Sequence, residues 1–404
     1  MKIAIIGGGP AGCIAAIAAS KAGNEVHIYE KNEKLGKKLF ITGKGRCNLT
    51  NAADRETVMD NIVSNPKFLF SSFKAFSNED ICRLIEEAGC PLKTERGDRV
   101  FPVSDHSWDV IDALKKLLKQ AGVHIHLNHE IKKLDELDAD KIIIATGGLS
   151  YPSTGSTGDG YRFAKRLGHS IVDTVPALVP LELEEFHSKC TIPSGLSLKN
   201  IEASVYDGDK LLYSEFGEML FTHFGVSGPV ILSASSHIAK RLKEKKLILR
   251  IDLKPALDEE KLDARILRDF EESKNKALKN SLNKLLLSGL IEEVIKQSGI
   301  DPDKKVNAIT KEERSQLIKA IKELKFTIVR TRGYNEAIIT QGGVSTKEID
   351  PKTMQSKIEP TVYFAGEVID IDAHTGGFNL QLAWSTGYAA GSAAAQETDI
   401  CRKA

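Results

Sequence analysis

A glycine cluster near the N-terminus has the composition and context of a dinucleotide-binding turn. The segment Gly7-Gly8-Gly9-Pro10-Ala11-Gly12 follows the apolar run 2–6 and precedes the small-residue stretch 13–22, which predicts a strand, a tight turn and a helix. In such a unit Gly7 makes the turn, Gly9 lets the backbone approach a pyrophosphate, and Gly12 lets the helix lie close to the strand. The N-terminus of that helix offers free N–H groups to the phosphates.

A carboxylate stands at the end of the next predicted strand. The run 25–29 ends in Glu30, which lies 18 positions after Gly12. An acidic residue near this spacing accepts a hydrogen bond from a ribose 2′-hydroxyl, which favours an adenosine ribose without a 2′-phosphate. The alternative is a glycine turn that holds no ligand, but strand, turn, helix, second strand and acid all agree with a dinucleotide.

The loop after Glu30 is basic, punctuated by glycines and too long for a simple βαβ connection. Its glycines permit a close backbone approach, and its cations could meet phosphates or an electron-rich ring system. These cations are Lys37, Lys38, Lys44 and Arg46. The alternative is a solvated basic loop.

A second glycine loop occurs near the C-terminus. The buried strand predicted at 361–370 leads into Gly376 and Gly377, and a helix of small residues then extends to Gly391. A helix N-terminus carries about half a positive charge, so it can stabilise electron density on a bound ring such as a reduced flavin. The alternative is a tight turn that only packs this helix on the sheet.

A further strand, predicted at 141–144, ends in the small-residue turn Ala145-Thr146-Gly147-Gly148. Such a turn suits the carboxyl edge of a parallel sheet, where the chain crosses a bound cofactor. By itself this signal is weak. The polar loop 150–160 that follows could be a hinge, a substrate loop or a connector.

Histidines and one arginine are the candidate proton donors. His223 lies in the segment 220–229, which joins a predicted strand to a predicted helix, and His374 lies in the C-terminal glycine loop. Arg46 is the third candidate. A lone histidine is more often a structural residue than a catalyst, so both interpretations stay open.

The patterning divides the chain into three parts. Helical spacing predicts helices at 78–88 and 107–121, and alternation predicts a strand at 123–127 that continues over 130–134. Short strands at 201–206, 211–215, 218–222 and 247–251 predict a small antiparallel β domain, and 257–326 reads as helical with a strand at 325–331. We place an FAD-binding domain at 1–188 and 335–404, a β domain on the substrate side at 189–255 and 326–334, and a helical insertion at 256–325.

Composition narrows the class of protein. The 404 residues carry a formal charge of +1 with scattered lysines, which argues against a nucleic-acid partner. No apolar run approaches the ~18 residues that span a bilayer, and a strand rather than a signal peptide opens the chain, so we expect a cytoplasmic protein with no membrane contact. We expect reduced thiols and no metal site because the cysteines have no C-x-x-C or zinc spacing. They are Cys13, Cys47, Cys82, Cys90, Cys190 and Cys401.

Together these motifs resemble the BaiN/YhiN-type bacterial flavoproteins, also labelled the aminoacetone oxidase family, over nearly the whole chain. The most discriminating stretch is Gly43-Lys44-Gly45-Arg46-Cys47-Asn48. The resemblance implies an α/β fold in which both termini build a Rossmann-like FAD-binding domain, with an inserted β-barrel-like domain that carries a small helical subdomain. The helical segment itself adds nothing to the match.

The resemblance also implies where FAD would lie. The opening glycines hold the ADP half with Glu30 on the ribose, Lys38 and the loop 42–48 follow the pyrophosphate and flavin, Ile131 lends backbone to the adenine, and 366–381 meets the ribityl chain and ring. The full set of predicted cofactor-binding residues is Gly7, Gly9, Pro10, Ala11, Gly12, Glu30, Lys31, Lys38, Thr42, Gly43, Arg46, Cys47, Asn48, Ile131, Thr146, Gly147, Gly366, Glu367, Asp370, Gly376, Gly377, Phe378, Asn379 and Leu380.

Two function hypotheses follow. The first is an FAD-dependent oxidoreductase that transfers a hydride between flavin and a small organic substrate. No second Gly-x-Gly-x-x-Gly occurs, so NAD(P)H would act only as a transient reductant that reaches the flavin through the substrate cleft. The alternative is a sensor or interaction protein in which FAD is structural. The sequence leaves the substrate, the electron acceptor and the oligomeric state open.

Overall fold

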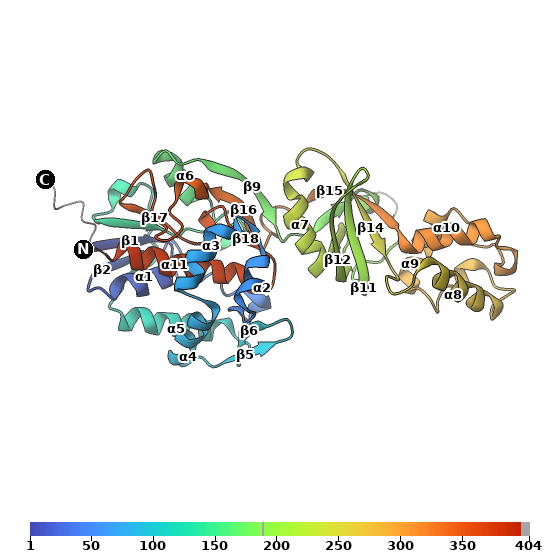
Figure 1. The fold of residues 1–404 in the computed structure, drawn as a ribbon, viewed down its shortest axis with the longest axis horizontal. Helices are drawn as coiled ribbons and strands as arrows, with labels where there is room; N and C mark the ends of the chain where they lie inside the picture. The colour runs from blue at the N-terminus through green and yellow to red at the C-terminus, as the bar shows by residue number, and fades with distance from the viewer. Residues whose placement is uncertain (188–189, 397–404) are drawn as a thin grey trace. The chain divides into compact units, whose positions relative to one another are not determined.

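The structure is a computed structural model that describes residues 1–187 and 190–396, so Cys401 lies outside the described residues. The chain forms two compact units (Figure 1). Residues 1–176 and 334–404 make the first unit, and residues 177–333 make the second. The three-domain boundaries given above stay a prediction.

The first unit is built on a five-stranded parallel sheet in the order β17-β8-β1-β2-β7. In the central pairs, Ile3 lies opposite Val26 on one side and opposite Lys141 on the other. All the strands are parallel, so their carboxyl ends meet at one edge, where ligands of open α/β sheets bind. The strands are β1 (Lys2–Ile6), β2 (Glu25–Tyr29), β7 (His124–His126), β8 (Lys141–Ile144) and β17 (Val362–Phe364).

Two helices made of small residues pack against each other beside this sheet. They are α1 (Pro10–Ser20) and α11 (Phe378–Ala394), from opposite ends of the chain. A Cβ added at Gly387 would lie 2.4 Å from the Ala11 carbonyl oxygen, and one at Gly391 would lie 2.1 Å from the Ala15 carbonyl oxygen. Only glycine permits this approach, which places both helix N-termini in the same unit.

Shorter elements complete the first unit, and the predicted helices at 78–88 and 107–121 are confirmed. The predicted strand continuation at 130–134 is wrong, because only His124–His126 is strand and the chain then becomes irregular. The helices are α2 (Arg55–Asp60), α3 (Pro66–Ala75), α4 (Asn78–Glu87), α5 (Ser107–Gln120) and α6 (Asp159–Arg166). The small sheets are β3 (Thr50–Asn51), β6 (Arg99–Pro102) and β5 (Leu92–Glu95); β4 (Ile62–Ser64) with β18 (Asp372–Ala373); and β9 (Ile171–Ala177) with β16 (Ile339–Val344).

The second unit is a closed barrel in the order β10-β13-β12-β11-β14-β15, with α7 (Pro229–Leu242) packed against β12. The prediction of separate strands at 211–215 and 218–222, with a break near Gly217, is wrong, because β12 runs through Gly217, which pairs with Ile201. Glycine is needed there for another reason: an added Cβ would lie 2.7 Å from the Val230 side chain of α7. The strands are β10 (Leu181–Leu183), β11 (Ser197–Asp207), β12 (Lys210–Phe221), β13 (Gly225–Ser227), β14 (Leu247–Asp252) and β15 (Leu324–Thr331).

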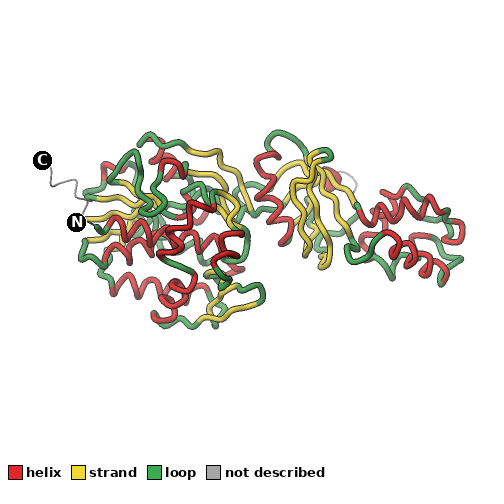
Figure 2. The backbone as a smooth tube through the Cα atoms, in the orientation of Figure 1, coloured by secondary structure: helices red, strands yellow, loops and turns green. Residues whose placement is uncertain are grey.

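Three helices come between β14 and β15 in the sequence. Figure 2 draws them as a group of red helices beyond the yellow strands of the barrel. They are α8 (Glu259–Glu271), α9 (Ser288–Ser298) and α10 (Lys311–Lys322). Asp258 caps α8, and Thr310 forms a capping box with Glu313 at α10, which satisfies N–H groups that each helix start leaves free. Their apolar faces share one buried core with the barrel.

Across the described residues, no helix combines the length and the apolar character that crossing a membrane requires.

Candidate cofactor-binding site

Two of the N-terminal glycines are packed tightly against backbone atoms, and a third faces open space. Gly7 has φ +107°, and an added Cβ would lie 2.4 Å from the Ala145 carbonyl oxygen of the neighbouring turn. A Cβ at Gly12 would lie 1.9 Å from the Gly7 carbonyl oxygen, whereas a Cβ at Gly9 would meet no atom within 4 Å. Gly7 and Gly12 therefore seat the helix on the sheet, and Gly9 leaves space beside the backbone.

Helix α1 begins with an uncapped N-terminus at this open position. Its N-cap, Gly9, makes no side-chain cap, and its first turn holds no acidic residue. The first amides of a helix have no intrahelical partner and carry partial positive charge. The N–H groups of Ala11 and Gly12 therefore fit a phosphate ligand.

Hydrogen bonds hold the Glu30 side chain beside the glycine turn. Its side chain is buried, and Oε2 accepts a hydrogen bond from the Gly8 N–H at 2.8 Å. Oε1 accepts from the backbone N–H of Asn32 at 2.8 Å and from its Nδ2 at 2.6 Å. Because a carboxylate offers about four lone-pair sites, the three bonds orient the group and leave room for a ribose hydroxyl.

Lys31 is ion-paired rather than free. Its Nζ donates to Thr157 Oγ1 at 2.6 Å and to Asp159 Oδ2 at 2.7 Å. Burial raises the pKa of the Asp159 carboxyl, but Lys31, Thr157 and Arg162 together outweigh it and hold the net pKa below its ordinary value. In this arrangement Lys31 anchors the polar loop 150–160 to the end of β2.

Lys38 also forms an ion pair with a carboxylate. Its Nζ lies 2.7 Å from Glu367 Oε2 and 2.7 Å from Ser150 Oγ. The other oxygen of Glu367 accepts from Ser150 Oγ at 2.7 Å and from the Thr340 N–H at 2.7 Å. The network joins four segments of the first unit that are distant in the sequence.

The segment 42–48 forms a tight turn that carries the 3-10 helix η1 (Thr42–Gly45). Cys47 has φ +61° and is fully buried, and its N–H donates to the Thr42 carbonyl at 3.1 Å. Burial raises the pKa of its thiol to about 12, so Cys47 is not a thiolate nucleophile at neutral pH. Asn48 Oδ1 is buried with no protein partner in the structure, which makes it an acceptor available to a ligand.

Arg46 is held as a fixed positive charge. Its guanidinium pairs with Glu95 at 2.9 Å and Asp105 at 3.1 Å and lies 4.0 Å from the centre of the Phe101 ring. The hydrogen bond to Glu95 is the main cause that raises the pKa of Arg46 above its ordinary value. This environment suits an electrostatic role better than proton donation.

The C-terminal glycine loop lies directly against the segment that follows Asn48. Gly377 has φ +102°, and an added Cβ would lie 2.4 Å from the Thr50 carbonyl oxygen. Asn51 Nδ2 donates to the Gly376 carbonyl at 3.0 Å, and Thr50 Oγ1 donates to Gln381 Oε1 at 2.7 Å. The two glycine-containing loops therefore form one continuous surface.

Helix α11 begins with a second uncapped N-terminus. Gly377 is its N-cap without a side-chain cap, and its first turn, from the buried Phe378 through Leu380, has no acid. Asn379 is used structurally, because its amide bonds the Ala373 N–H at 2.9 Å and the Ala373 carbonyl at 2.7 Å. That clamp fixes the loop that precedes the helix.

The remaining predicted residues lie around these loops. Thr146 Oγ1 is a second buried atom with no protein partner, and Gly147, with φ +71°, lies against Ser156. Asp370 accepts from Asn65 Nδ2 at 3.0 Å, Ile131 is buried, and Gly366 lies against Ala11. The open space at Gly9, the two uncapped helices and the orphaned acceptors Asn48 and Thr146 together fit a dinucleotide such as FAD.

The candidate proton donors have different local surroundings. His374 is half-buried, with Nδ1 3.4 Å from Asn61 Oδ1. His223 belongs to the second unit, where its exposed ring contacts Phe224 with ring centres 4.9 Å apart. Arg46 and His374 belong to the first unit, so the three candidate donors come from both units of the chain.

Sequence reasoning missed several polar residues that join the loops. Asn32, Ser150, Asp159 and Thr340 each bond a predicted site residue. No local pattern marks them, since each is a common polar residue. Only the folded contacts reveal their positions.

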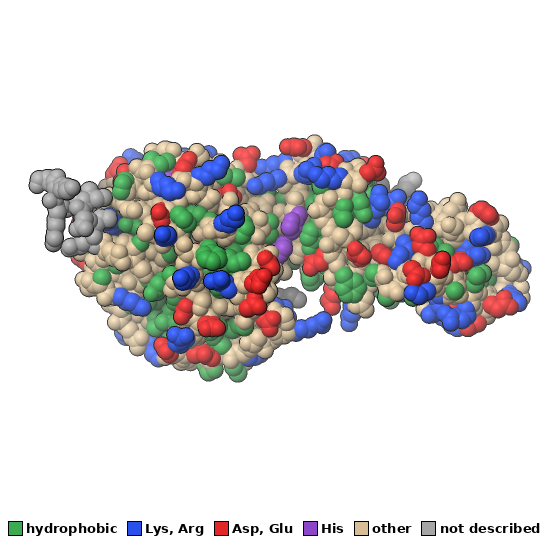
Figure 3. All heavy atoms as spheres, viewed as in Figure 1, with side chains coloured by type: hydrophobic (Ala, Val, Ile, Leu, Met, Phe, Trp, Pro, Cys, Tyr) green, Lys and Arg blue, Asp and Glu red, His purple; other side chains and the backbone are tan. Residues whose placement is uncertain are grey.

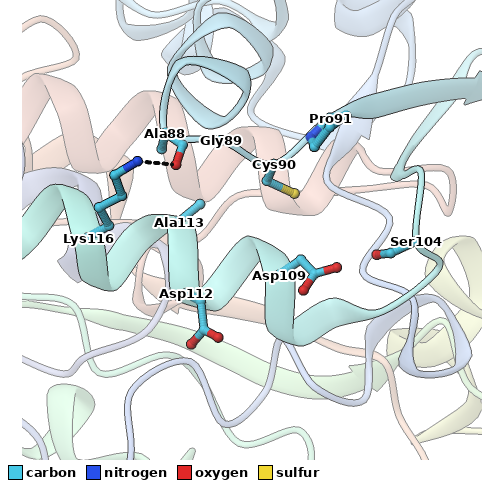
Figure 4. A pocket seen from close by; sticks show the side chains of 9 residues that line it. All are labelled: Ala88, Gly89, Cys90, Pro91, Ser104, Asp109, Asp112, Ala113 and Lys116. Carbon is cyan, nitrogen blue, oxygen red and sulfur yellow. Dashed lines mark hydrogen bonds between the residues drawn. The ribbon is translucent and has the colours of Figure 1, made fainter.

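A separate hollow of about 380 Å³ lies between the end of α4 and α5 (Figure 4). Lys116 Nζ crosses part of it to the Ala88 carbonyl at 2.9 Å. It contains none of the predicted site residues, so it is distinct from the cofactor loops. Its lining residues are Ala88, Gly89, Cys90, Pro91, Ser104, Asp109, Asp112, Ala113 and Lys116.

Comparison with known proteins agrees with the class that the fold and loops define, a Rossmann-type flavoprotein. The family described as HI0933-like protein Rossmann domain matches residues 1–393. The chain belongs to this family, and the predicted BaiN/YhiN-type class is confirmed. The predicted α/β fold with an inserted β-barrel and the prediction of an oxidoreductase enzyme are also confirmed.

Named relatives cover nearly the whole chain. The 3-dehydro-bile acid delta(4,6)-reductase of Clostridium scindens is 31% identical over 411 residues, or 98% of this chain and 99% of the relative. The ribosomal RNA dihydrouridine synthase of Haemophilus influenzae is 31% identical over 402 residues, or 95% of this chain and 96% of the relative. A solved 3-ketosteroid-delta4-(5alpha)-dehydrogenase of Rhodococcus jostii covers 98% of this chain and 96% of its own at 14% identity and a TM-score of 0.48, too distant to support conclusions about chemistry.

Proposed function

We propose that this protein is an FAD-dependent oxidoreductase that transfers a hydride between the flavin and a small organic substrate, with NAD(P)H as a transient reductant. The observation that carries the proposal is the pair of uncapped helix N-termini, α1 and α11, in one unit. They are preceded by Gly9 and Gly377 and are packed together at Gly387. Two such termini fit the two ends of one extended cofactor.

In this proposal each loop has a defined task. Glu30 binds the adenosine ribose, the first amides of α1 bind the pyrophosphate, and the N-terminus of α11 stabilises negative charge at the ring edge. Glu95 and Asp105 hold the Arg46 guanidinium in place and balance its charge, so its proposed task is to position the cofactor. When bound, FAD supplies the two-electron redox chemistry, and the protein supplies orientation and electrostatics.

We further propose that the substrate carries a carbon–carbon double bond that an adjacent carbonyl activates. This class is consistent with the names of two relatives, a bile acid delta(4,6)-reductase and a dihydrouridine synthase. A proton must be delivered as well as a hydride, and His374 and His223 are the proposed donors.

A second candidate function is reduction of a nucleobase within ribosomal RNA, because the relatives in Haemophilus influenzae and Escherichia coli are named for that activity. The distribution of surface charge favours a small-molecule substrate over RNA. On the face drawn in Figure 3, acidic and basic side chains alternate and form no basic stripe. Several cations of the second unit are paired, including Arg241 and Lys245 with Asp207.

The test begins with the purified chain reconstituted with FAD under anaerobic conditions. We expect a flavin absorbance spectrum that NADH or NADPH bleaches, and reoxidation on addition of a conjugated enone. Reoxidation by unmodified ribosomal RNA but not by the enone would favour the second function. A bound flavin that no nicotinamide or substrate bleaches or reoxidises would overturn the redox proposal and favour a structural cofactor.

A further inference from the structure

A cluster of histidines lies on β2 and β7 of the first unit, apart from the loops described above. The register places His27 opposite His124 and Tyr29 opposite His126. Side chains alternate along a strand, so Glu25 and His27 face the same side of β2, while Val26 and Ile28 face the buried side. The cluster therefore gathers on one face at the edge of the parallel sheet.

Three members of the cluster present possible metal-ligand atoms close to one another. One nitrogen each of His27 and His124 and one oxygen of Glu25 all lie within 4.8 Å of one another. Glu25 Oε1 is 2.8 Å from His27 Nε2, and the rings of His27 and His124 stack with centres 4.8 Å apart. Donors at about 2.1 Å from a tetrahedral ion lie roughly 3.4 Å apart, so small side-chain rotations bring all three onto one ion.

His126 supplies the outer contact that a metal-bound histidine normally makes. His27 Nδ1 lies 2.9 Å from His126 Nε2. A metal-ligating imidazole usually donates its second ring N–H to a neighbouring acceptor, which fixes its tautomer and orientation. With His27 Nδ1–H donating to His126, the unprotonated Nε2 faces the Glu25 carboxylate at 2.8 Å. Both atoms are then acceptors, and a cation would satisfy them.

From this geometry we propose that Glu25, His27 and His124 bind one divalent transition-metal ion of the zinc class, with a solvent molecule as the fourth ligand. Two imidazoles and one carboxylate are donors that suit Zn²⁺ and its neighbours rather than Mg²⁺ or Ca²⁺. Glu25 and Glu30 stand at opposite ends of β2, about 16 Å apart along the strand. The ion therefore links β2 to the edge strand β7 rather than contacting a nucleotide at the carboxyl edge.

The test is titration of the chelator-treated, full-length protein with Zn²⁺ by calorimetry, and with Co²⁺ by visible absorbance. We expect one equivalent to bind, with the absorbance bands of a low-symmetry N and O site. His27→Gln and His124→Gln each weaken binding by more than about tenfold, and His126→Gln weakens it by roughly tenfold through the outer contact. Bound metal raises the thermal midpoint, and a chelator reverses that shift.

His106→Gln is the matched control. His106 is exposed and lies in the same unit as the cluster, and its ring contacts the Trp108 ring rather than another histidine. This variant should bind Zn²⁺ as the wild type does. Circular dichroism without metal checks that every variant is folded, and His124, an exposed edge residue, is the variant least able to disturb the core. The proposal is overturned if no saturable equivalent binds, or if binding survives unchanged in both folded ligand variants.

Discussion

At the scale of single residues, Gly12 is needed for packing, whereas Gly9 leaves space that a ligand can enter. We expect Gly12→Ala to destabilise the fold by about 2–3 kcal/mol, because the new Cβ would lie 1.9 Å from the Gly7 carbonyl oxygen. Gly9→Ala should cost at most about 1 kcal/mol as an N-cap change, since its Cβ enters open space. It should nevertheless lower FAD affinity by roughly tenfold, because that space is where the pyrophosphate must approach.

Urea unfolding and FAD titration by fluorescence measure the two quantities separately. Equal FAD affinity for Gly9→Ala and wild type would show that the open side of Gly9 does not face the cofactor.

His169, which lies away from the cofactor loops, makes the free energy of unfolding depend on pH. Its side chain is fully buried, with Nε2 2.7 Å from Ser356 Oγ and Nδ1 3.1 Å from Glu348 Oε2. Burial lowers the pKa of His169, and Glu348 only partly offsets this effect. The native state therefore binds the proton less readily than the unfolded chain, so this stability is present above the unfolded pKa of about 6.5 and is lost as pH falls below it.

Between about pH 7.5 and pH 5.5 we expect the wild type to lose up to roughly 1.4 kcal/mol more unfolding free energy than His169→Asn, since one unit of pKa difference is worth that much. Carboxyl groups with ordinary pKa values stay ionised over this range. Denaturant unfolding at both pH values measures the difference, and parallel losses in the two proteins would exclude His169 as the source.

At the scale of elements, the N-terminus of α11 depends on Gly377. Gly377→Ala adds a Cβ at 2.4 Å from the Thr50 carbonyl oxygen on a residue with φ +102°. Gly23→Ala is the matched control, because Gly23 has φ +74° and nothing within 4 Å. We expect about 1 kcal/mol of loss for the control, a larger loss for Gly377→Ala, and a fall in FAD affinity for Gly377→Ala alone.

Thermal unfolding and FAD titration of both variants provide the comparison. Similar losses in the two proteins would mean that backbone strain, rather than contact between the two loops, sets the requirement for glycine.

The Lys38–Glu367 pair joins elements that are far apart in the sequence. Both side chains are about four-fifths buried, and their charged atoms lie 2.7 Å apart. A double-mutant cycle of Lys38→Met and Glu367→Gln should give a coupling free energy of about 1–3 kcal/mol. The Lys37–Glu33 pair, at 3.3 Å with Glu33 exposed, should give less than about 0.5 kcal/mol in the same measurement. Equal coupling in the two pairs would contradict the assigned linking role.

At the scale of the whole molecule, the first unit has its own continuous core from both ends of the chain. The chain leaves and re-enters it on β9 and β16, which pair with each other. Replacing 178–332 with a short Gly-Ser linker should therefore leave a cooperatively folding unit that binds FAD, but without enone reduction. Loss of FAD binding in a folded, shortened protein would show that the second unit contributes to the cofactor site.

Much of the first unit was predictable because its signals are local. The glycine cluster, Glu30 and the small residues of α1 lie within thirty positions, and the two strands and the helix predicted there formed. The strand predicted at 361–370 is shorter, because only Val362–Phe364 pairs with β8. The 130–134 continuation and the break at Gly217 failed because strand ends and glycines depend on partners: β7 pairs only over His124–His126, and Gly217 makes room for Val230.

The sequence by itself determined the kind of site, since turn glycines, uncapped helix starts and one acid after a strand are set by short-range backbone geometry. Only the tertiary structure decided what each side chain contacts. By residue type alone, Lys31 and Lys38 are suited to bind phosphate. In the structure they form ion pairs with Asp159 and Glu367, and Arg46 forms one with Glu95. Ion pairs and close approaches join positions up to hundreds of residues apart, and no local pattern encodes which partner will lie within 3 Å.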